Sequence, residues 1–259
     1  MYKKCIIFVF LILGITSQIC FAENVQFESN SKSEDGNPLI LDGILTKPNG
    51  KGPFPAVVLL HGCGGLEDGK PRSEAWSNRL VAFGYATLQL DSFAPRGIKD
   101  DCKIPSSIIL RARAHDAYDA KSYLSELPYV DRNRIAVLGW SHGGMTVLNI
   151  IENTYRDDKP FKAAIAFYPW CSFLTQPNSP LMILIGESDD WTPAYRCSRA
   201  MPSMQTEHEI ILKIYPGAYH DFDWEGMDET YGAHRLLYDP VAAQDAIIQV
   251  KSFLAKHLK

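Results

Sequence analysis

Short apolar runs alternate with longer amphipathic segments along most of this chain of 259 residues. The run 54–60 is apolar and β-branched, which is typical of a strand buried on both faces of a sheet. We expect strands over 39–46, 54–60, 85–90, 134–138, 161–168, 181–185 and 209–215. The other segments predict helices over 72–83, 108–127, 145–152, 194–204 and 241–258. This alternation predicts an α/β fold with a mostly parallel central sheet and helices on both faces.

Apolar residues make up 46% of the chain and charged residues 22%, which is ordinary globular composition. This composition argues against disorder, a collagen-like repeat and a coiled coil, and the length fits one domain. The formal net charge is −4, so the basic surface that nucleic-acid binding needs is missing and no nucleic-acid partner is expected. In parallel sheets, ligands bind beyond the carboxyl ends of the strands, and we expect the site there.

The first 22 residues differ in character from the rest of the chain. Lys3 and Lys4 precede an apolar run over 5–15, and Ala22 ends a Cys-Phe-Ala sequence. This pattern is typical of a secretory signal peptide, and the run is shorter than the roughly 20 residues that span a bilayer. We expect cleavage near Ala22, a single domain over 23–259 without a membrane span, and a secreted or periplasmic protein. A membrane anchor is the alternative.

Removal of this leader would leave four cysteines, Cys63, Cys102, Cys171 and Cys197. In an oxidising compartment an even number predicts up to two disulfides, but four cysteines allow three pairings. A bond between Cys63 and Cys102 would tie two loops of the site together, and four free thiols are the alternative. The cysteines do not have zinc-site spacing. We expect neither a metal nor a cofactor.

The expected strand 134–138 leads straight into Gly139-Trp-Ser-His-Gly-Gly144, a G-x-S-x-G pattern between a strand and a helix. Such a turn is the setting of a nucleophile elbow, in which strained backbone geometry lifts the serine hydroxyl into the cleft. Its glycines avoid clashes with the adjacent strand and helix. Ser141 is therefore the candidate nucleophile, and the start of the following helix would favour developing negative charge.

A serine hydroxyl becomes a good nucleophile only when a base removes its proton and a third group orients that base. An acid and a histidine each follow a later expected strand, in the chain order that this elbow requires. His220 follows the strand 209–215 and is the candidate base. Asp189 and Asp190 follow the strand 181–185, and Asp189 is the candidate acid, with Asp190 as the alternative.

The expected strand 54–60 ends in His61-Gly-Cys-Gly-Gly65, a glycine-rich turn of a type that presents backbone N–H groups to the cleft. We expect the backbone N–H groups of Cys63 and His142 to bind the oxyanion of a tetrahedral intermediate. One such donor is typically worth roughly 3–4 kcal/mol of transition-state stabilisation. The imidazole of His61 is interpreted as structural, with hydrogen bonds inside the loop.

From residue 39 to residue 258 these motifs resemble the α/β-hydrolase superfamily and, within it, the dienelactone hydrolase family. The resemblance implies the α/β-hydrolase fold and the hydrolysis of an ester bond. In that family the acid lies three residues after a strand-ending glycine and four before a proline. Those residues are Gly186 and Pro193 here, so the resemblance favours Asp189 over Asp190.

The chain departs from the family's namesake enzymes at several positions. They have cysteine where this chain has Ser141, and a substrate-binding arginine where it has Trp224. Arg96 lies one residue away from the place of another such arginine. The pattern is more similar to a general serine esterase, so the family's chemistry carries over better than its specificity. Candidate substrate contacts are Arg96, Trp140, Trp191 and Trp224.

Two charged segments are interpreted as solvent-exposed. One is an acidic stretch that does not have the spacing of a calcium-binding EF-hand loop, formed by Asp221, Asp223, Glu225, Asp228 and Glu229. The other is the outer face of the helix 108–127, which carries Arg111, Arg113, Asp116, Asp119 and Lys121.

Three classes of function fit these residues. The first is a serine hydrolase that cleaves a small-molecule ester or lactone through an acyl-enzyme, with Ser141 as nucleophile, His220 as base and Asp189 as orienting acid. The second is a small-peptide hydrolase of the prolyl-oligopeptidase type. The third is a non-catalytic binding protein on the same fold. Because all three members of a triad are present, the first hypothesis is favoured.

Overall fold

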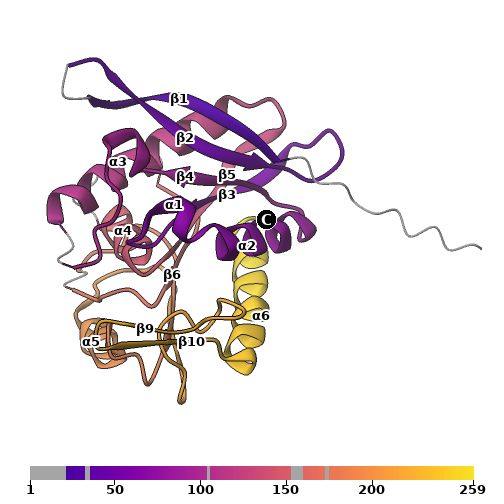
Figure 1. Ribbon diagram of the computed structural model, residues 1–259. Helices are drawn as coiled ribbons and strands as arrows, with labels where there is room; N and C mark the ends of the chain where they lie inside the picture. The colour runs from indigo at the N-terminus through magenta and orange to yellow at the C-terminus, as the bar shows by residue number, and fades with distance from the viewer. Residues whose placement is uncertain (1–21, 33–35, 104–105, 153–159, 173–174) are drawn as a thin grey trace, which may run out of the picture.

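The computed structural model describes residues 22–32, 36–103, 106–152, 160–172 and 175–259. Its centre is an eight-stranded sheet with the strand order β1-β2-β4-β3-β5-β6-β7-β8 (Figure 1). The parallel part consists of β3 (Phe54–Leu60), β4 (Ala86–Asp91), β5 (Val130–Trp140), β6 (Ala164–Phe167), β7 (Leu181–Gly186) and β8 (Ile210–Tyr215). At one edge the sheet is extended by the antiparallel strands β1 (Ala22–Lys32) and β2 (Pro38–Thr46).

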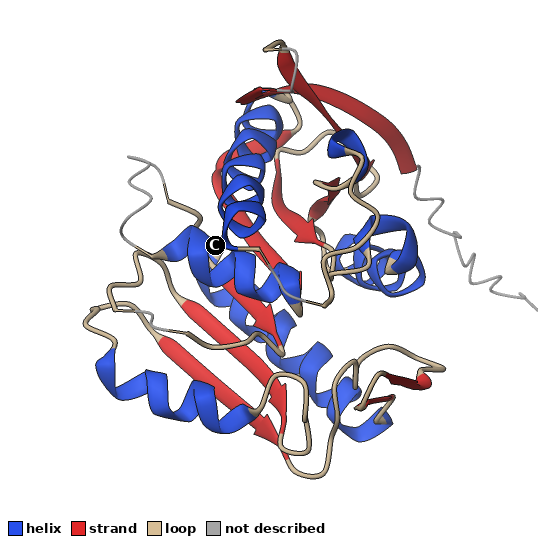
Figure 2. Cartoon of the chain, turned by 60° about the vertical axis from the view of Figure 1, so that its left-hand side comes forward, coloured by secondary structure: helices blue, strands red, loops and turns tan. Residues whose placement is uncertain are grey.

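Helices cover both faces of this sheet, because strands such as β6 and β7 are apolar and buried along their whole length. One face is covered by α3 (Ser107–Glu126) and α4 (His142–Ile151), and the other by α2 (Lys70–Ala82) and α6 (Pro240–His257) (Figure 1). The connections contain α1 (Gly65–Asp68), η1 (Ala94–Arg96), α5 (Ala194–Ala200) and η2 (Met201–Ser203). A separate hairpin, seen apart from the main sheet in Figure 2, consists of β9 (Asp228–Tyr231) and β10 (His234–Leu237).

The fold class predicted from the sequence is confirmed, and each expected strand and helix has a counterpart in the structure. Three strands were not expected, namely β1 and the hairpin β9–β10. In β1 the buried residues alternate with exposed ones at Val25, Phe27 and Ser29. This period of two is the pattern of a half-buried antiparallel strand, so the signal for β1 is present in the sequence.

The expected charged outer face of α3 is wrong for four of its five members. The side chains that are buried are those of Arg113, Asp116, Asp119 and Lys121. The unexpected strand β1 lies against α3, and the Ser29 hydroxyl donates to Asp119 Oδ2 at 2.6 Å. Asp116 accepts two hydrogen bonds from Arg96, at 2.7 and 2.8 Å. These partners offset the loss of hydration that burial of a charge entails.

Two disulfides join the four cysteines, Cys63 with Cys102 and Cys171 with Cys197. The pairing considered for Cys63 and Cys102 is therefore present, and it links the turn after β3 to the loop that precedes α3. Disulfides of this kind indicate an oxidising compartment. Among the residues that the structure describes, no helix is both long and apolar enough to cross a membrane.

Candidate active site

Ser141 lies at the sharp turn between β5 and α4, where its backbone angles are φ 52° and ψ −112°. Residues other than glycine rarely adopt a positive φ, so this turn is strained. A Cβ on Gly143 would lie 2.1 Å from the carbonyl oxygen of Leu60, and one on Gly139 would lie 2.3 Å from that of Gly143. Only glycine fits at either position. The close packing against β3 keeps Ser141 raised at the carboxyl end of the sheet.

Asp189 and His220 follow β7 and β8, and their side chains are bonded to each other. His220 Nδ1 lies 2.7 Å from Asp189 Oδ2, and both side chains are buried. Asp189 Oδ1 accepts hydrogen bonds from the backbone N–H groups of Trp191 at 3.0 Å and Thr192 at 2.8 Å. The Thr192 hydroxyl donates to Asp189 Oδ2, also at 2.8 Å. Because all of these neighbours are donors, the carboxylate holds the proton of His220 on Nδ1.

The electrostatics of this pair favour the charged forms. Burial raises the pKa of Asp189, but the charge and hydrogen bond of His220 outweigh it, so that pKa lies below its ordinary value. Burial lowers the pKa of His220, but the charge of Asp189 and its hydrogen bond have a larger effect in the opposite direction, so that pKa lies above its ordinary value. A histidine with a raised pKa is a stronger base, which suits proton transfer from a hydroxyl.

Ser141 and His220 line the same cleft, and Trp191 stands beside them. The indole of Trp191 is stacked on Tyr231 of β9 with ring centroids 5.0 Å apart, and on His234 of β10 with centroids 5.1 Å apart. Its other neighbour is the ring of His220, also at 5.1 Å. The hairpin that the sequence analysis missed therefore supports a tryptophan of the site.

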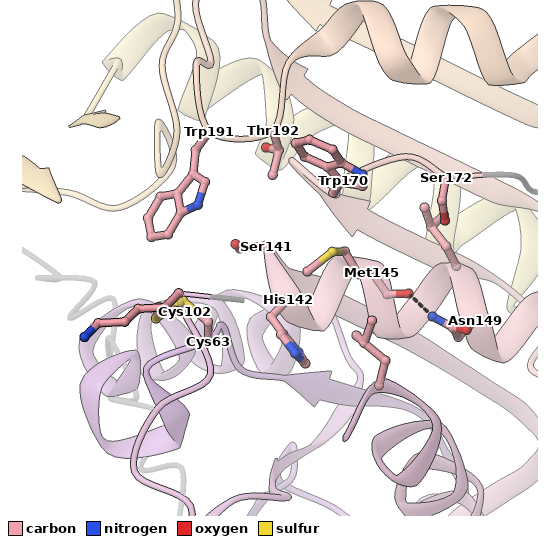
Figure 3. A pocket seen from close by; sticks show the side chains of 13 residues that line it. Cys63, Cys102, Ser141, His142, Met145, Asn149, Trp170, Ser172, Trp191 and Thr192 are labelled. Carbon is pink, nitrogen blue, oxygen red and sulfur yellow. Dashed lines mark hydrogen bonds between the residues drawn. A yellow bond between two sulfur atoms is a disulfide. The ribbon is translucent and has the colours of Figure 1, made fainter. Parts of the chain in front are cut away.

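Ser141 also lines a second cavity, of about 420 Å³. Its apolar lining comes from Leu110, Met145, Leu148, Trp170 and Trp191. Figure 3 shows the indoles of Trp170 and Trp191 on one side of Ser141 and the disulfide on the other. The candidate nucleophile thus lines two hollows, one of which can hold an apolar group.

Cys63 and His142, the expected oxyanion donors, occupy the turns after β3 and β5. In the described part of the chain, neither backbone N–H donates to a protein acceptor. His142 is the first residue of α4, where N–H groups have no partner within the helix. His61 is buried, with Nδ1 2.7 Å from the carbonyl oxygen of Gly62 and Nε2 accepting the backbone N–H of Ser92. Its imidazole is structural, as expected.

Two of the four candidate substrate contacts are engaged elsewhere. The guanidinium of Arg96 forms an ion pair with the buried carboxylate of Asp116. Arg96 does not line either cavity. Trp140 is fully buried and its Nε1–H donates to Asp223 at 3.0 Å. In the structure each of these two side chains is therefore bonded to a buried acid.

The other two candidate contacts line the cleft, whereas the alternative acid does not reach the histidine. Trp191 and Trp224 both line the cleft that contains Ser141. Asp190 is exposed, with Oδ1 3.3 Å from His234 Nδ1, so it does not reach His220. Of the two acids, Asp189 is the one bonded to the histidine.

A buried ion network stands behind His220, and the sequence analysis missed it. Arg72 of α2 forms an ion pair with Asp221 and donates to the hydroxyl of Tyr168 at 2.9 Å. Asp223 accepts hydrogen bonds from Tyr168 and from Nε1–H of Trp76, both at 2.6 Å. The prediction of a solvated acidic loop is therefore wrong for Asp221 and Asp223, which are buried. No motif spacing marks Arg72, because its partners lie far away along the chain.

The fold is that of the α/β-hydrolase superfamily. Within it, the dienelactone hydrolase family model matches residues 41–258. The chain belongs to the dienelactone hydrolase family. The resemblance inferred from the motifs is confirmed.

Individual relatives match only part of the chain, at about 30% identity. The chain is 31% identical over 123 residues to the quorum-quenching protein AidA of Acinetobacter baumannii, covering 47% of this chain and 39% of AidA. It is 27% identical over 139 residues to esterase EstD of Thermotoga maritima, covering 53% of this chain and 32% of EstD. A third match, to probable dipeptidyl-aminopeptidase B of Grosmannia clavigera, is 31% identical over 94 residues and covers 34% of this chain and 9% of that protein. The chain thus spans less than half the length of each of these relatives.

A solved structure resembles the whole chain. The crystal structure of the dienelactone hydrolase-like promiscuous phosphotriesterase P91, from metagenomic libraries, superposes with a TM-score of 0.72. The match covers 93% of this chain and 99% of that one at 21% sequence identity. At this identity the likeness concerns the fold.

Proposed function

We propose that this protein is a serine hydrolase that cleaves carboxylic esters or lactones through an acyl-enzyme. One observation carries the proposal: Ser141, on its strained turn, shares a cleft with His220, whose ring lies 2.7 Å from Asp189. A nucleophile, a base and an orienting acid are the groups that covalent hydrolysis requires. The family membership and the likeness to an esterase support the same chemistry.

In the first half of the reaction, Ser141 Oγ attacks the ester carbonyl carbon while His220 Nε2 takes the hydroxyl proton. Asp189 keeps the ring oriented and stabilises the imidazolium. The negative charge on the carbonyl oxygen is bound by the N–H groups of Cys63 and His142. The carbon–oxygen bond to the alcohol then breaks, and the alcohol leaves with the proton from His220.

In the second half, water replaces the alcohol. His220 takes a proton from the water, and the resulting hydroxide attacks the acyl carbonyl. The bond to Ser141 breaks, Ser141 recovers its proton from His220, and the carboxylic acid is released. A lactone gives a hydroxy acid by the same steps, because its alcohol and acid belong to one molecule.

The lining of the site favours neutral substrates with an apolar group. The cavity of about 420 Å³ beside Ser141 has Met145, Trp170 and Trp191 in its wall. The guanidinium of Arg96 is held by Asp116 and lines neither hollow. Arg72, in the lining of the cleft, is paired with Asp221, and Lys103, in the lining of the cavity, is exposed to solvent. Burial of a carboxylate without a paired cation is costly. We therefore expect neutral esters to be better substrates than anionic dienelactones.

A fluorophosphonate probe tests the proposal, because it modifies a serine that a base has activated. Labelling followed by mass spectrometry should give one adduct, on Ser141, in the wild-type protein. Ser141→Ala and His220→Ala should abolish it. The control is Ser198→Ala, which removes an exposed hydroxyl of α5 and should label like wild type. A folded wild-type protein without an adduct would refute the proposal and favour the binding-protein hypothesis.

The likeness to a dipeptidyl-aminopeptidase keeps peptide hydrolysis as a second candidate. An ester and an amide with the same acyl group separate the two. We expect hydrolysis of the ester at a much higher kcat/KM. Comparable turnover of the amide would favour the peptidase.

Export belongs to the same proposal. The two disulfides support an oxidising compartment. We propose that residues 1–22 are removed as a signal peptide and that 23–259 act as one secreted or periplasmic domain. Amino-terminal sequencing of the exported protein should begin near residue 23. A mature protein that retains residues 1–22 would refute this proposal.

A further inference from the structure

The imidazole of His142 is buried below the cleft, between an arginine and an aspartate. Arg113 of α3 donates to its Nδ1, and its Nε2 lies 3.0 Å from Asp101 Oδ2. Burial and then the charge of Arg113 lower the pKa of His142 to about 2. The ring is therefore neutral. Because Nδ1 accepts from Arg113, the ring proton lies on Nε2 and is donated to Asp101.

The same arginine and the same aspartate also hold the turn after β3. Arg113 donates a second hydrogen bond, at 2.7 Å, to the carbonyl oxygen of His61. The backbone N–H of Asp101 donates to the carbonyl oxygen of Cys63 at 2.9 Å. The next residue, Cys102, is joined to Cys63 by the disulfide. Asp101 Oδ2 also accepts the backbone N–H of Ser106, at 3.0 Å, which anchors the carboxylate.

These contacts form a closed ring. It passes from Cys63 to Asp101, from Asp101 to His142, from His142 to Arg113, and from Arg113 back to the turn through His61. Two members of this set, Cys63 and His142, are the residues whose backbone N–H groups are proposed to bind the oxyanion.

We propose that Asp101 is a positioning residue that sets the distance between the two oxyanion donors. It holds Cys63 through its backbone N–H and His142 through its carboxylate. The inference rests on the proposed function, since it matters only when a tetrahedral oxyanion forms next to Ser141.

The geometry explains why such a residue is needed. His142 is fixed by α4, but Cys63 lies in a loop between β3 and α1. Oxyanion donors work only when both lie about 2.7–3.1 Å from the charged oxygen, and displacement of about 1 Å can lower a rate by two orders of magnitude. A link from the loop to the ring of His142 therefore ties the less constrained donor to the more constrained one.

Three variants test the role of Asp101. Asp101→Ala removes the acceptor of the His142 proton. Asp101→Asn keeps an oxygen that can accept from both His142 Nε2–H and Ser106 N–H, but removes the charge. The control is Glu126→Gln, which removes one negative charge from an exposed residue at the end of α3 that lines neither hollow of the site.

Steady-state hydrolysis of one neutral ester gives the main readout. We expect Asp101→Ala to lower kcat about 10- to 100-fold with KM within about twofold, because the lost positioning acts on the transition state. Asp101→Asn should recover kcat to within about fivefold of wild type, and Glu126→Gln should be indistinguishable from wild type. If the alanine variant loses its fold in a thermal melt, Asp101→Ser repeats the test with a side chain too short to reach His142.

The tautomer of His142 gives an independent readout. With ¹⁵N-labelled histidine, wild type should show one buried ring protonated on Nε2 that does not titrate between about pH 5 and 9. This signature should persist in Asp101→Asn and change in Asp101→Ala.

The outcomes separate this inference from the proposed function. A wild-type protein without probe labelling and without esterase activity overturns both. Wild-type activity together with an unchanged kcat in the folded alanine variant overturns only the role of Asp101. A folded Asp101→Asn that is as slow as Asp101→Ala also overturns it, because charge and not position would then be the cause.

Discussion

Replacement of Asp189 by asparagine tests the proposed triad with a minimal change of shape. The carboxylate is surrounded by donors: the backbone N–H groups of Trp191 and Thr192 on Oδ1, and the Thr192 hydroxyl and His220 Nδ1–H on Oδ2. Asparagine has one oxygen, so its NH₂ group must replace Oδ1 or Oδ2. The backbone donors cannot turn away, and the amide oxygen therefore takes them. The NH₂ group then faces His220.

The consequence is the wrong tautomer of the base. A donor opposite His220 Nδ1 makes that nitrogen an acceptor and moves the ring proton to Nε2, which can then no longer take the proton of Ser141. In a serine triad, this replacement lowers kcat by about 10⁴-fold. The pKa of His220 also falls, because burial lowers it and the Asp189 charge and hydrogen bond are what raise it.

The fall in pKa gives the pH profile a definite sign. Activity needs neutral His220, so wild-type kcat/KM should rise with pH through a pKa above the ordinary value of about 6.5. In Asp189→Asn this rise should move to lower pH, while the plateau drops. We would measure acid release in a pH-stat on a neutral ester from roughly pH 5 to 9.

The neighbouring acid supplies the control. Asp190 is exposed and is bonded to His234 and to the backbone N–H of Arg235. Asp190→Asn should keep both the wild-type kcat and the wild-type pH profile. A folded Asp189→Asn that retains more than about a tenth of wild-type kcat, or an unchanged acid limb, would refute the reasoning.

Three further predictions concern stability and specificity. Gly143→Ala places a Cβ 2.1 Å from a backbone oxygen of β3 and should lower the free energy of unfolding by more than about 4 kcal/mol in urea titration. Its control is Gly62→Ala, whose Cβ would have no neighbour closer than 3.5 Å and which should lower that free energy by less than about 1 kcal/mol. Replacement of Cys171 and Cys197 by serine opens a loop with a sequence separation of 26 and should lower the free energy of unfolding by about 3.5 kcal/mol in the same assay. Equal stability of this variant and wild type would contradict the prediction. Trp140→Phe removes a donor from a buried carboxylate and should cost about 1–3 kcal/mol, yet leave KM unchanged; an altered KM would restore this residue as a substrate contact.

The parallel strands could be predicted because their signal is local. A strand buried on both faces is a continuous apolar run, and β3 has the same bounds, Phe54–Leu60, in the sequence analysis and in the structure. β1 shows how the signal weakens at the edge of the sheet. Only every second residue is buried there, at Val25, Phe27 and Ser29, and one of the three is polar.

The charges on α3 could not be placed from the helix alone. A charged side chain usually faces water, so Arg113 and Asp116 were expected on the outer face. Their burial depends on residues outside α3: Asp116 is paired with Arg96 in η1, and Arg113 is bonded to the carbonyl of His61 and to the ring of His142. No helical period contains that information, because it depends on which loops fold over the helix.

The same distinction separates the proposed reacting groups of the site from the groups that hold them. Ser141, Asp189 and His220 could be predicted because each must stand at a strand end, where glycines and chain order mark the place. Arg72 carries no such mark, since its partner Asp221 lies 149 residues away along the chain. Yet Asp221 directly follows His220 and has a positive φ of 58°, an angle that residues other than glycine seldom adopt. Strain of this kind persists only where the surroundings enforce it. The buried ion pair with Arg72 is such a constraint, so the position of the proposed base depends on a contact that only the folded chain reveals.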